Sequence, residues 1–324
     1  VWEYYQITQD TGFLRDDGAE MFIELARFWA GISKKDPETG RYEIAGVMGP
    51  DEFHEKYPGA ETGGIKDNSY TNIMVAWLLR TTAEVLDLIG ADARQRVAAK
   101  TGLRDDEGAA WADIAARLNL RVSSDGILEQ FDGYFGLEEL DWDAYRQKYG
   151  AIGRMDRLLK AEGKSPDDYK VAKQPDALMP FYVLPNHELR EILSSLGHEA
   201  GPDLLAKNFA YYLPRTSHGS TLSRLVHAHL ANRAGQPEVS WDLYCQALRS
   251  DYADTQGGTT KEGIHTGVMA GTVLLALTSY AGLDTSGPTV RLTPSLPAGW
   301  RTMRFNIGFR DRRYHFVVTP ETVE

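Results

Sequence analysis

Apolar residues recur with helical spacing through most of the chain and alternate only towards its C-terminal end. The clearest case is residues 69–89, where Ile73, Trp77, Val85 and Ile89 share one wide face. Further helices are expected over residues 1–31 with a turn within them, 105–119, 175–184, 186–195, 202–212, 220–232, 238–250 and 264–281. Because short polar turns separate most of the later segments, we expect these helices to be antiparallel neighbours.

The pattern changes at residues 286–288, which read Ser-Gly-Pro. The segments TVRLTPSLP, MRFNIGF and YHFVVTP alternate and are rich in β-branched and aromatic residues, which predicts antiparallel strands. Two or three strands are marginally stable by themselves, so this sheet must be completed elsewhere or pack against the helices. The sequence therefore predicts a mainly α domain over residues 1–286 and the start of a small antiparallel β-sheet domain over residues 287–324.

The longest polar interruption is residues 46–72, GVMGPDEFHEKYPGAETGGIKDNSYTN. Such a long loop is usually functional or disordered, and its aromatic residues Phe53 and Tyr57 argue against disorder. Asn68 is the predicted N-cap of the helix that follows. Glu52 could protonate a leaving glycosidic oxygen if apolar surroundings kept it protonated near neutral pH. Pro-Asp-Glu by itself is a weak signal, because most acidic loop residues are merely solvated.

Composition excludes several classes of partner. Hydrophobic residues make up 42% of the chain and charged residues 25%, as in a globular protein with a sizeable core. The net charge of −11 disfavours nucleic acids and anionic membranes. The single cysteine, Cys245, and an opening segment without a signal-peptide pattern predict a cytoplasmic location. Residues 263–283 lack Asp, Glu, Lys and Arg, but their scattered polar residues predict a helix buried on most sides rather than a membrane span.

Two predicted helices start with polar residues that could bind an anion. Residues 218–223 are His-Gly-Ser-Thr-Leu-Ser, and residues 262–267 are Glu-Gly-Ile-His-Thr-Gly. Helix N-termini present unpaired N–H groups, to which neighbouring hydroxyls add donors. Ordinary N-capping by Ser and Thr is the alternative. Before them, Lys173 and Gln174 could bind sugar hydroxyls, although Lys173 could equally form a surface salt bridge.

Together these segments resemble glycoside hydrolase family 65, the family of maltose, trehalose and kojibiose phosphorylases. The resemblance is carried, in chain order, by GVMGPDEFH, DNSYTN, EQFDGYF, KQPD, HGSTLS and EGIHTG. It implies an (α/α)6 barrel, here lacking its first helices, and hence a portion of a longer polypeptide. Small departures from the family pattern occur at Pro175 and Ser69, and neither removes a reacting group.

The resemblance also implies a site and a reaction. Glu52 would be the catalytic general acid, Lys173 and Gln174 would contact the glucosyl unit, and the phosphate pocket would consist of Ser220, Thr221, Ser223 and His265. The expected reaction is inverting phosphorolysis of an α-glucosyl disaccharide to β-glucose 1-phosphate. Inorganic phosphate is then the co-substrate, with no metal and no other cofactor, and the family suggests a homodimer.

Two alternatives stay open. In a hydrolase of the same family, a carboxylate would act as base on water, and Glu262 would be the nearest candidate. In a non-catalytic sugar-binding protein, Glu52 would have no chemical role. The acceptor sugar would be selected by residues 59–66 and by the aromatic tract 131–145, where Phe131, Tyr134 or Trp142 could stack on it or simply pack in the core.

Overall fold

The computed structural model describes residues 1–49, 53–174, 176–253 and 263–323. The first group of helices comprises α1 (Trp2–Thr8), α2 (Thr11–Phe13), α3 (Ala19–Ile32), α4 (Ser69–Leu88), α5 (Ala91–Thr101) and α6 (Glu107–Arg117). The second comprises α7 (Trp142–Tyr149), α8 (Met155–Ala161), α9 (Met179–Val183), α10 (Asn186–Ser195), α11 (Leu204–Tyr212), α12 (Thr221–Arg233), α13 (Pro237–Arg249) and α14 (Thr266–Leu275). The strands are β1 (Lys34–Lys35), β2 (Tyr42–Glu43), β3 (Ala45–Val47), β4 (Ile65–Lys66), β5 (Leu283–Asp284), β6 (Arg291–Leu292), β7 (Met303–Phe309) and β8 (Arg312–Val318).

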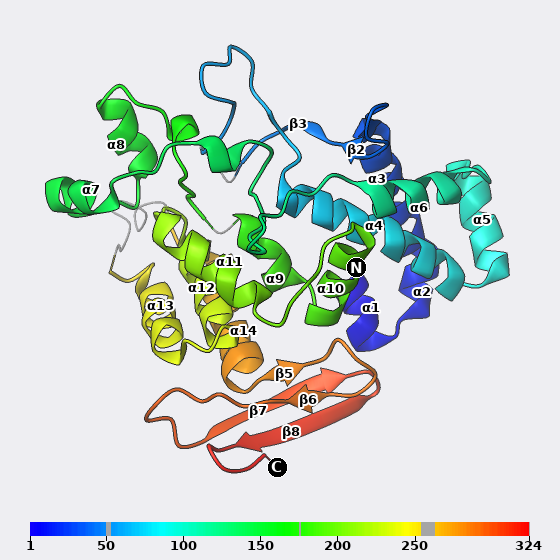
Figure 1. The fold of residues 1–324 in the computed structure, drawn as a ribbon. Coiled ribbons are helices and arrows are strands. Elements are labelled where there is room, and N and C mark those ends of the chain that lie inside the picture. The colour runs from blue at the N-terminus through cyan, green and yellow to red at the C-terminus, as the bar shows by residue number, and fades with distance from the viewer. Residues whose placement is uncertain (50–52, 175, 254–262, 324) are drawn as a thin grey trace.

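The helices form one continuous body. In Figure 1, α3–α6 lie on one side, α12 and α13 on the other, α9–α11 between them, and α14 next to the C-terminal strands. Helix α4 packs against α3 and α6 and also reaches α9 and α10, while α12 packs along α13. The largest apolar cluster includes residues from Tyr5 to Ala231, and a separate cluster joins α12, α13 and α14 through Leu225, Leu243 and Leu275. The prediction of a mainly α chain followed by antiparallel strands is confirmed.

Helix α4 is the central helix of this arrangement, and its start follows the sequence prediction. The Asn68 side chain accepts a hydrogen bond from the backbone N–H of Thr71, as expected of an N-cap. At the other end, Gly90 has a φ of 79°, a conformation that glycine adopts without strain. The predicted apolar face is buried at Ile73 and Val85. The helix is therefore fixed at both ends and along one side.

The prediction for residues 263–283 is wrong in one respect. The segment is helical as α14 followed by a π-helical turn over Ala276–Tyr280, but it is not buried on most sides. Val268 and Leu275 are buried, whereas Val273 is 64% exposed. The reason is that α12 and α13 cover only one face of α14. No helix among the described residues is long and apolar enough to cross a membrane.

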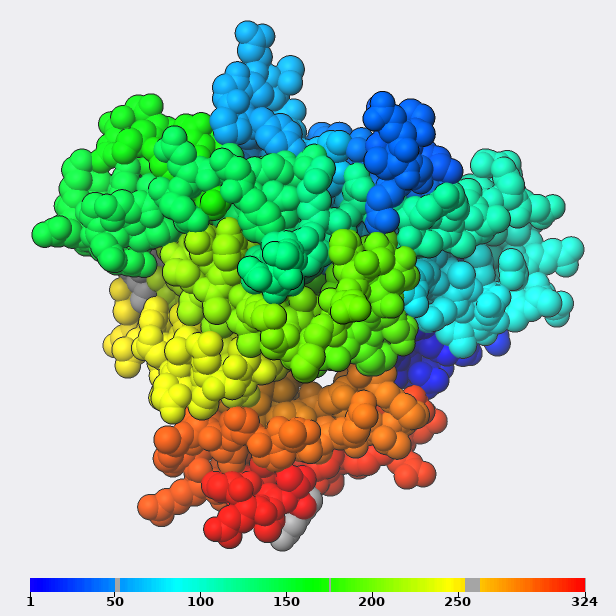
Figure 2. Space-filling view, viewed as in Figure 1, coloured from blue at the N-terminus to red at the C-terminus, as the bar shows by residue number. Residues whose placement is uncertain are grey.

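The C-terminal strands pair as the alternation predicted. β7 and β8 form an antiparallel hairpin in which Phe305 faces Phe316, and β5 pairs with β6. These strands lean on helices, because the N–H of Arg310 donates to the carbonyl of Ile7 and Trp300 packs on Trp241 and Tyr280. Figure 2 shows this part (orange to red) against the helical body. The division of the chain after residue 286 stays a prediction.

Helices α5 and α8 were missed in the sequence, and α7 lies in residues 127–150, where only a mix of loop and short helix is expected. α5 is short of large apolar residues, with only Ala93 and Val97 buried. α7 and α8 lie in the charged tract before residue 168, where their buried residues are too few for a clear period. Both pack around Phe53 in a small apolar cluster of their own, which also includes Trp142, Tyr145, Met155 and Leu159.

An ion pair between α3 and α6 gives a stability prediction. Two oxygens of Glu107 accept hydrogen bonds from the Arg27 guanidinium at 2.8 and 2.9 Å, and a third comes from the N–H of Arg104. The hydrogen bonds from Arg27 lower the pKa of Glu107 to about 2. Since the unfolded value is about 4.3, the pair stabilises the fold at neutral pH, and this contribution is lost as the pH falls through about 2.

We expect Glu107→Gln to lower the free energy of unfolding at pH 7 by roughly 2 kcal/mol, as for a hydrogen bond to a charged group. The difference from the unsubstituted protein should shrink as the pH falls from about 4 towards 2. Denaturant melts at several pH values measure it, with Glu61→Gln, at an exposed loop position, as the control. A difference that does not change with pH would contradict the assignment.

Candidate functional site

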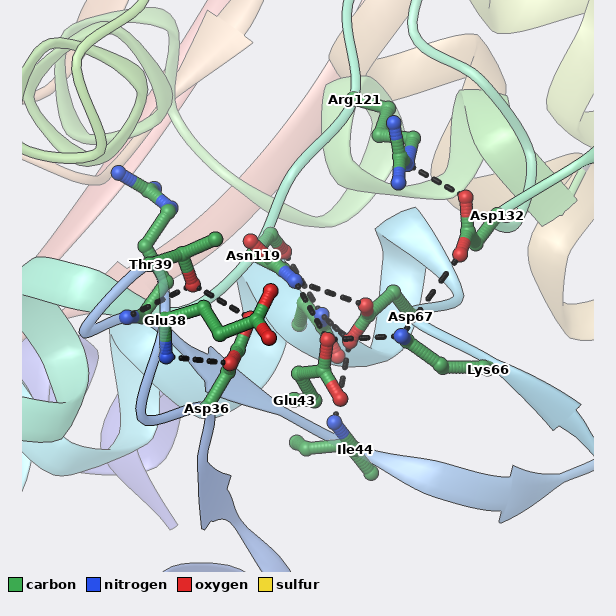
Figure 3. A network of polar contacts seen from close by, with 12 residues as sticks. Asp36, Glu38, Thr39, Glu43, Ile44, Lys66, Asp67, Asn119, Arg121 and Asp132 are labelled. Carbon is green, nitrogen blue, oxygen red and sulfur yellow. Dashed lines mark hydrogen bonds and ion pairs between the residues drawn. The ribbon is translucent and has the colours of Figure 1, made fainter.

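The loop that carries Glu52 is closed at its base by Asp67. The N–H of Ile44 donates to the Asp67 carboxylate at 3.0 Å, and the N–H of Asp67 donates to the carbonyl of Ile44 at 2.8 Å. Amides of Asn72 and Asn119 also donate to this carboxylate. Figure 3 shows the contacts of Asp67 with Ile44 and Asn119 beside the ion pairs that link Lys66 to Glu43 and Asp132. Residues 44 and 67 are thus held together, and the segment between them must return on itself.

Inside the loop, the residues on either side of the Pro-Asp-Glu motif are firmly placed. The N–H of Gly49 donates to the carbonyl of His54 at 3.0 Å, and a Cβ at Gly49 would lie 2.6 Å from the Phe53 carbonyl oxygen. Phe53 and His54 are fully buried. Glu52 itself lies outside the described residues. In Figure 2 the later part of the loop (light blue) stands out at the top of the molecule.

His54 anchors the loop through two polar contacts of its ring, which is surrounded by aromatic side chains. Its Nε2 lies 2.9 Å from the carbonyl oxygen of Tyr169, and its Nδ1 lies 3.2 Å from the amide nitrogen of Gln130. Its ring packs against Phe131 and Tyr134. Burial lowers the pKa of His54 to about 4, so the ring is neutral at pH 7. Because φ is 53° at His54, the neighbouring contacts hold a strained backbone in place.

The KQPD segment joins the end of this loop through Asp176. The Asn68 amide donates to the buried Asp176 carboxyl at 2.6 Å. Asn68 is at the same time the N-cap of α4, so its amide orientation is fixed. Burial raises the pKa of Asp176 to about 6. Asp176 therefore links the acid loop to the segment that holds Lys173 and Gln174.

Residues 172–173 also pair with the segment that precedes α12. The N–H of Ser217 donates to the carbonyl of Ala172, and the N–H of Gly219 donates to the carbonyl of Lys173 at 3.1 Å. A Cβ at Gly219 would clash with the Gly153 carbonyl oxygen and lie 3.0 Å from Lys173 Cγ. Only glycine allows this close approach. The structure thus brings the predicted sugar-binding residue Lys173 next to the predicted phosphate-binding segment.

The start of α12 is not capped in the ordinary way. Ser220 is the N-cap residue, but its side chain makes no capping hydrogen bond. Thr221 is buried in the first turn. Ser223 is fully buried, and its hydroxyl lies 2.9 Å from Nδ1 of His218. The capping alternative therefore fails for Ser220, whereas the roles of all three hydroxyls in phosphate binding stay predictions.

His265 begins α14 and is oriented by an acid that the sequence did not reveal. Asp251, just beyond α13, accepts from the His265 backbone N–H at 2.8 Å and contacts its Nδ1 at 2.6 Å. The hydrogen bond from His265 lowers the pKa of Asp251. A carboxylate at Nδ1 fixes the orientation of the ring and leaves Nε2 as its remaining polar atom. Glu262, the candidate base of the hydrolase alternative, lies outside the described residues.

The aromatic tract does not form a sugar-stacking surface at the three rings considered in the sequence. Phe131 is 1% exposed and Tyr134 is fully buried, and both pack with His54. Trp142 lies in the apolar cluster around Phe53. Their role is core packing, the second of the two alternatives. They support the acid loop from beneath.

The sequence also missed residues that orient the predicted ones. Asp251, Asp176, His54 and His218 act through hydrogen bonds to backbone or to neighbouring side chains. His54, Asp176 and His218 stand inside recognised motifs, but nothing in the motifs indicates their partners. Within the described ranges, no cluster of His, Cys, Asp and Glu is arranged to hold a metal ion.

Comparison with known proteins shows which domains the chain matches. Residues 1–274 match the glycosyl hydrolase family 65 central catalytic domain, and residues 283–324 match the family's C-terminal domain. An "Uncharacterized glycosyl hydrolase" of Mycobacterium tuberculosis is 45% identical over 96% of this chain and 23% of its own length. "Trehalose 6-phosphate phosphorylase" of Lactococcus lactis is 40% identical over 98% of this chain and 40% of its own length.

A solved structure has the same fold. The "Putative kojibiose phosphorylase from human microbiome" superposes with a TM-score of 0.80 and 23% sequence identity, over 99% of this chain and 44% of that one. The chain thus spans less than half the length of each of these relatives. At this level of identity, the solved structure supports the fold alone.

The buried Asp176 carboxyl gives a pH-dependent prediction. Its folded pKa of about 6 lies above the unfolded value of about 3.9, so its contribution favours the fold below pH 4 and is lost as the pH rises through about 6. Asp176→Asn keeps an oxygen that can accept from Asn68 but cannot ionise. We expect this variant to become more stable than the unsubstituted protein as the pH rises from 4 to 7, by up to roughly 2–3 kcal/mol.

Thermal and denaturant melts between pH 4 and pH 7.5 measure this difference. Asp125→Asn, at an exposed position, is the control and should show no such trend. The opposite trend would be a loss of stability of Asp176→Asn, relative to the unsubstituted protein, between pH 4 and pH 7. It would show that the Asp176 carboxyl is not buried without a cationic partner.

Proposed function

Because the chain belongs to glycosyl hydrolase family 65, we propose that it is the catalytic part of an inverting phosphorylase of α-glucosyl disaccharides. One observation carries the proposal: a continuous set of backbone and side-chain hydrogen bonds joins three segments. The end of the acid loop meets the KQPD segment at Asn68 and Asp176, and that segment meets the HGSTLS segment at Lys173 and Gly219. Three motifs far apart in sequence therefore converge on one region.

The chemistry needs one protein carboxyl group. Glu52 donates a proton to the oxygen between the two sugars, and that bond breaks as an oxygen of inorganic phosphate bonds to the anomeric carbon from the opposite face. The products are β-glucose 1-phosphate and the free acceptor. An inverting hydrolase requires a second carboxylate to activate water. Phosphate is already anionic at pH 7 and needs no such base.

Support for the phosphate side comes from the two helix starts. The Ser220 hydroxyl makes no capping hydrogen bond, so it and the first N–H groups of α12 can donate to a ligand. Asp251 holds His265 at the start of α14 through contacts with its backbone N–H and its ring. Helix α14 packs against α12. Ser220, Thr221, Ser223 and His265 are accordingly proposed as phosphate ligands, with Lys173 and Gln174 on the glucosyl unit.

The relatives bear on the substrate. The Lactococcus lactis relative is named for trehalose 6-phosphate at 40% identity, whereas a kojibiose phosphorylase of Halothermothrix orenii is 27% identical. This difference favours a disaccharide that carries a phosphate group. Maltose, trehalose and kojibiose remain the unphosphorylated candidates. We further propose a cytoplasmic location, supported by the acidic composition and the lone cysteine, and a homodimer, supported by family resemblance.

The hydrolase alternative would require a base, and Glu262 is the candidate. The hydroxyl groups at the start of α12 and His265 at the start of α14 weigh against it, because a hydrolase needs no phosphate pocket. The alternative of a non-catalytic sugar-binding protein is weakened by the buried contacts that hold the acid loop at Phe53 and His54. A binding protein has no need for a strained and fully buried anchor beside a proton donor.

The deciding assay measures sugar release from α-glucosyl disaccharides by the full-length protein with and without inorganic phosphate. We expect turnover only with phosphate, and glucose 1-phosphate as a product. Glu52→Gln should lower kcat by about 10²-fold or more, as for loss of a general acid, without loss of sugar binding. Glu55→Gln, three residues further on at an exposed position, is the matched control.

Equal rates of glucose release in both conditions would identify a hydrolase instead. If Glu52→Gln changed no activity while sugar still bound, the protein would belong to the non-catalytic class.

A further inference from the structure

A cavity lined by two arginines lies beside the proposed sugar site. Residues from the α7–α8 connection and from the start of α12 enclose a cavity of about 260 Å³. Its charged and polar lining consists of Arg146, Thr216, Ser217, His218 and Arg224. Among the described residues the lining contains no carboxylate, although the whole chain has a net charge of −11.

The guanidinium of Arg224 is the informative group in this cavity. It donates to the amide oxygen of Gln246 at 2.9 Å and to the carbonyl of His218 at 3.3 Å. Within the described residues, no carboxylate lies at ion-pair distance from it. Burial lowers the pKa of Arg224, but a guanidinium stays charged in proteins. A partly buried cation with only neutral partners is costly unless an anion completes its surroundings.

Arg146 supplies a second cation from α7. It pairs with Asp143 at 3.1 Å on an exposed surface and lies over the ring of Trp142. Such an exposed pair contributes little and opens readily. Its charge reaches the cavity, since Arg146 and Arg224 both help to lower the pKa of His218, after burial and the neighbouring His227. Two guanidinium groups on opposite elements are a suitable donor set for a phosphate group.

The position of the cavity relates it to the sugar. Gly153, in its lining, is the residue whose carbonyl oxygen leaves no room for a side chain at Gly219. Gly219 in turn contacts the Lys173 side chain and donates its N–H to the Lys173 carbonyl. Gly219 therefore lies between Gly153, which lines the cavity, and Lys173.

We infer that the Arg146–Arg224 cavity binds the phosphate monoester of a phosphorylated sugar, with Arg224 as the fixed ligand and Arg146 as the second. The inference rests on the proposed function for the neighbouring sugar site. It deepens that function by placing the phosphate group of the substrate apart from the inorganic phosphate that reacts, which is assigned to Ser220, Thr221, Ser223 and His265. Glucose 6-phosphate is the simplest acceptor with this chemistry.

Two measurements on the full-length protein test it. In the synthetic direction, with β-glucose 1-phosphate as donor, KM is measured for glucose 6-phosphate and for glucose. Calorimetry measures the binding of glucose 6-phosphate, glucose and inorganic phosphate without turnover. We expect a clear preference for glucose 6-phosphate in both. Arg224→Gln and Arg146→Gln should weaken glucose 6-phosphate about 10- to 100-fold each, as for a lost hydrogen bond to a charged group.

Controls separate this role from a structural one. Arg224→Lys should recover part of the affinity, and Arg94→Gln on exposed α5 should change nothing. Arg146→Gln alters a half-exposed side chain, so it tests the inference even if Arg224→Gln fails to fold. The KM for inorganic phosphate in phosphorolysis should stay within about twofold in both cavity variants, below the threshold of a lost charged contact.

The outcomes distinguish the two proposals. If the variants raise the KM for inorganic phosphate and leave glucose 6-phosphate unchanged, the cavity is the site of the reacting phosphate and the inference is overturned. Equal binding of glucose and glucose 6-phosphate also overturns it. Arginine-dependent binding of glucose 6-phosphate without any phosphorolysis would support the cavity and reject the proposed reaction.

Discussion

The carboxylate of Asp67 is the contact on which the candidate site depends. It accepts hydrogen bonds from the backbone of Ile44 and from the amides of Asn72 and Asn119. Desolvation raises its pKa, and the three donors act against that rise. Because a buried carboxylate without donors would be costly, the three segments must meet there for the chain to fold. The acid loop is thereby built into the core at its base.

Hydrogen bonds also join the segments that follow Asp67. Asn68 caps α4 and binds Asp176, and the next segments pair through Lys173 and Gly219. The polar groups are buried and mostly satisfied, so they fix positions more firmly than exposed contacts would. In contrast, Arg224 at the neighbouring cavity has no acidic partner among the described residues, and Arg146 has only the exposed Asp143. Neutral, buried support and a positive charge that is only partly neutralised together suit a site for anionic sugars and phosphate.

The sequence predicted the fold in its main lines because most elements carry strong local signals. Helix α4 has a capping residue, an apolar face and a terminal glycine, and the β7–β8 hairpin alternates along both strands. The failures have physical reasons. α5 lacks large apolar residues, and the burial of α14 depends on which neighbours cover it, which no local pattern records.

For the site, the motifs indicated the segments but not their supports. Lys173 and the HGSTLS segment could be named from the sequence, and the structure brings their backbones together. Asp251 and Arg224 could not, since their importance lies in a contact with His265 and in the absence of an acidic partner among the described residues. Such properties arise only from the tertiary arrangement. The catalytic role of Glu52 stays a prediction.

The central claim is a single displacement, with one protein acid on the leaving oxygen and phosphate attacking from the opposite face. Proton NMR of the glucose 1-phosphate formed in the first minutes of phosphorolysis by the full-length protein tests it directly. The account predicts the β-anomer from an α-linked substrate. Formation of the α-anomer would contradict it, because retention requires either a second carboxylate as nucleophile or attack from the same face.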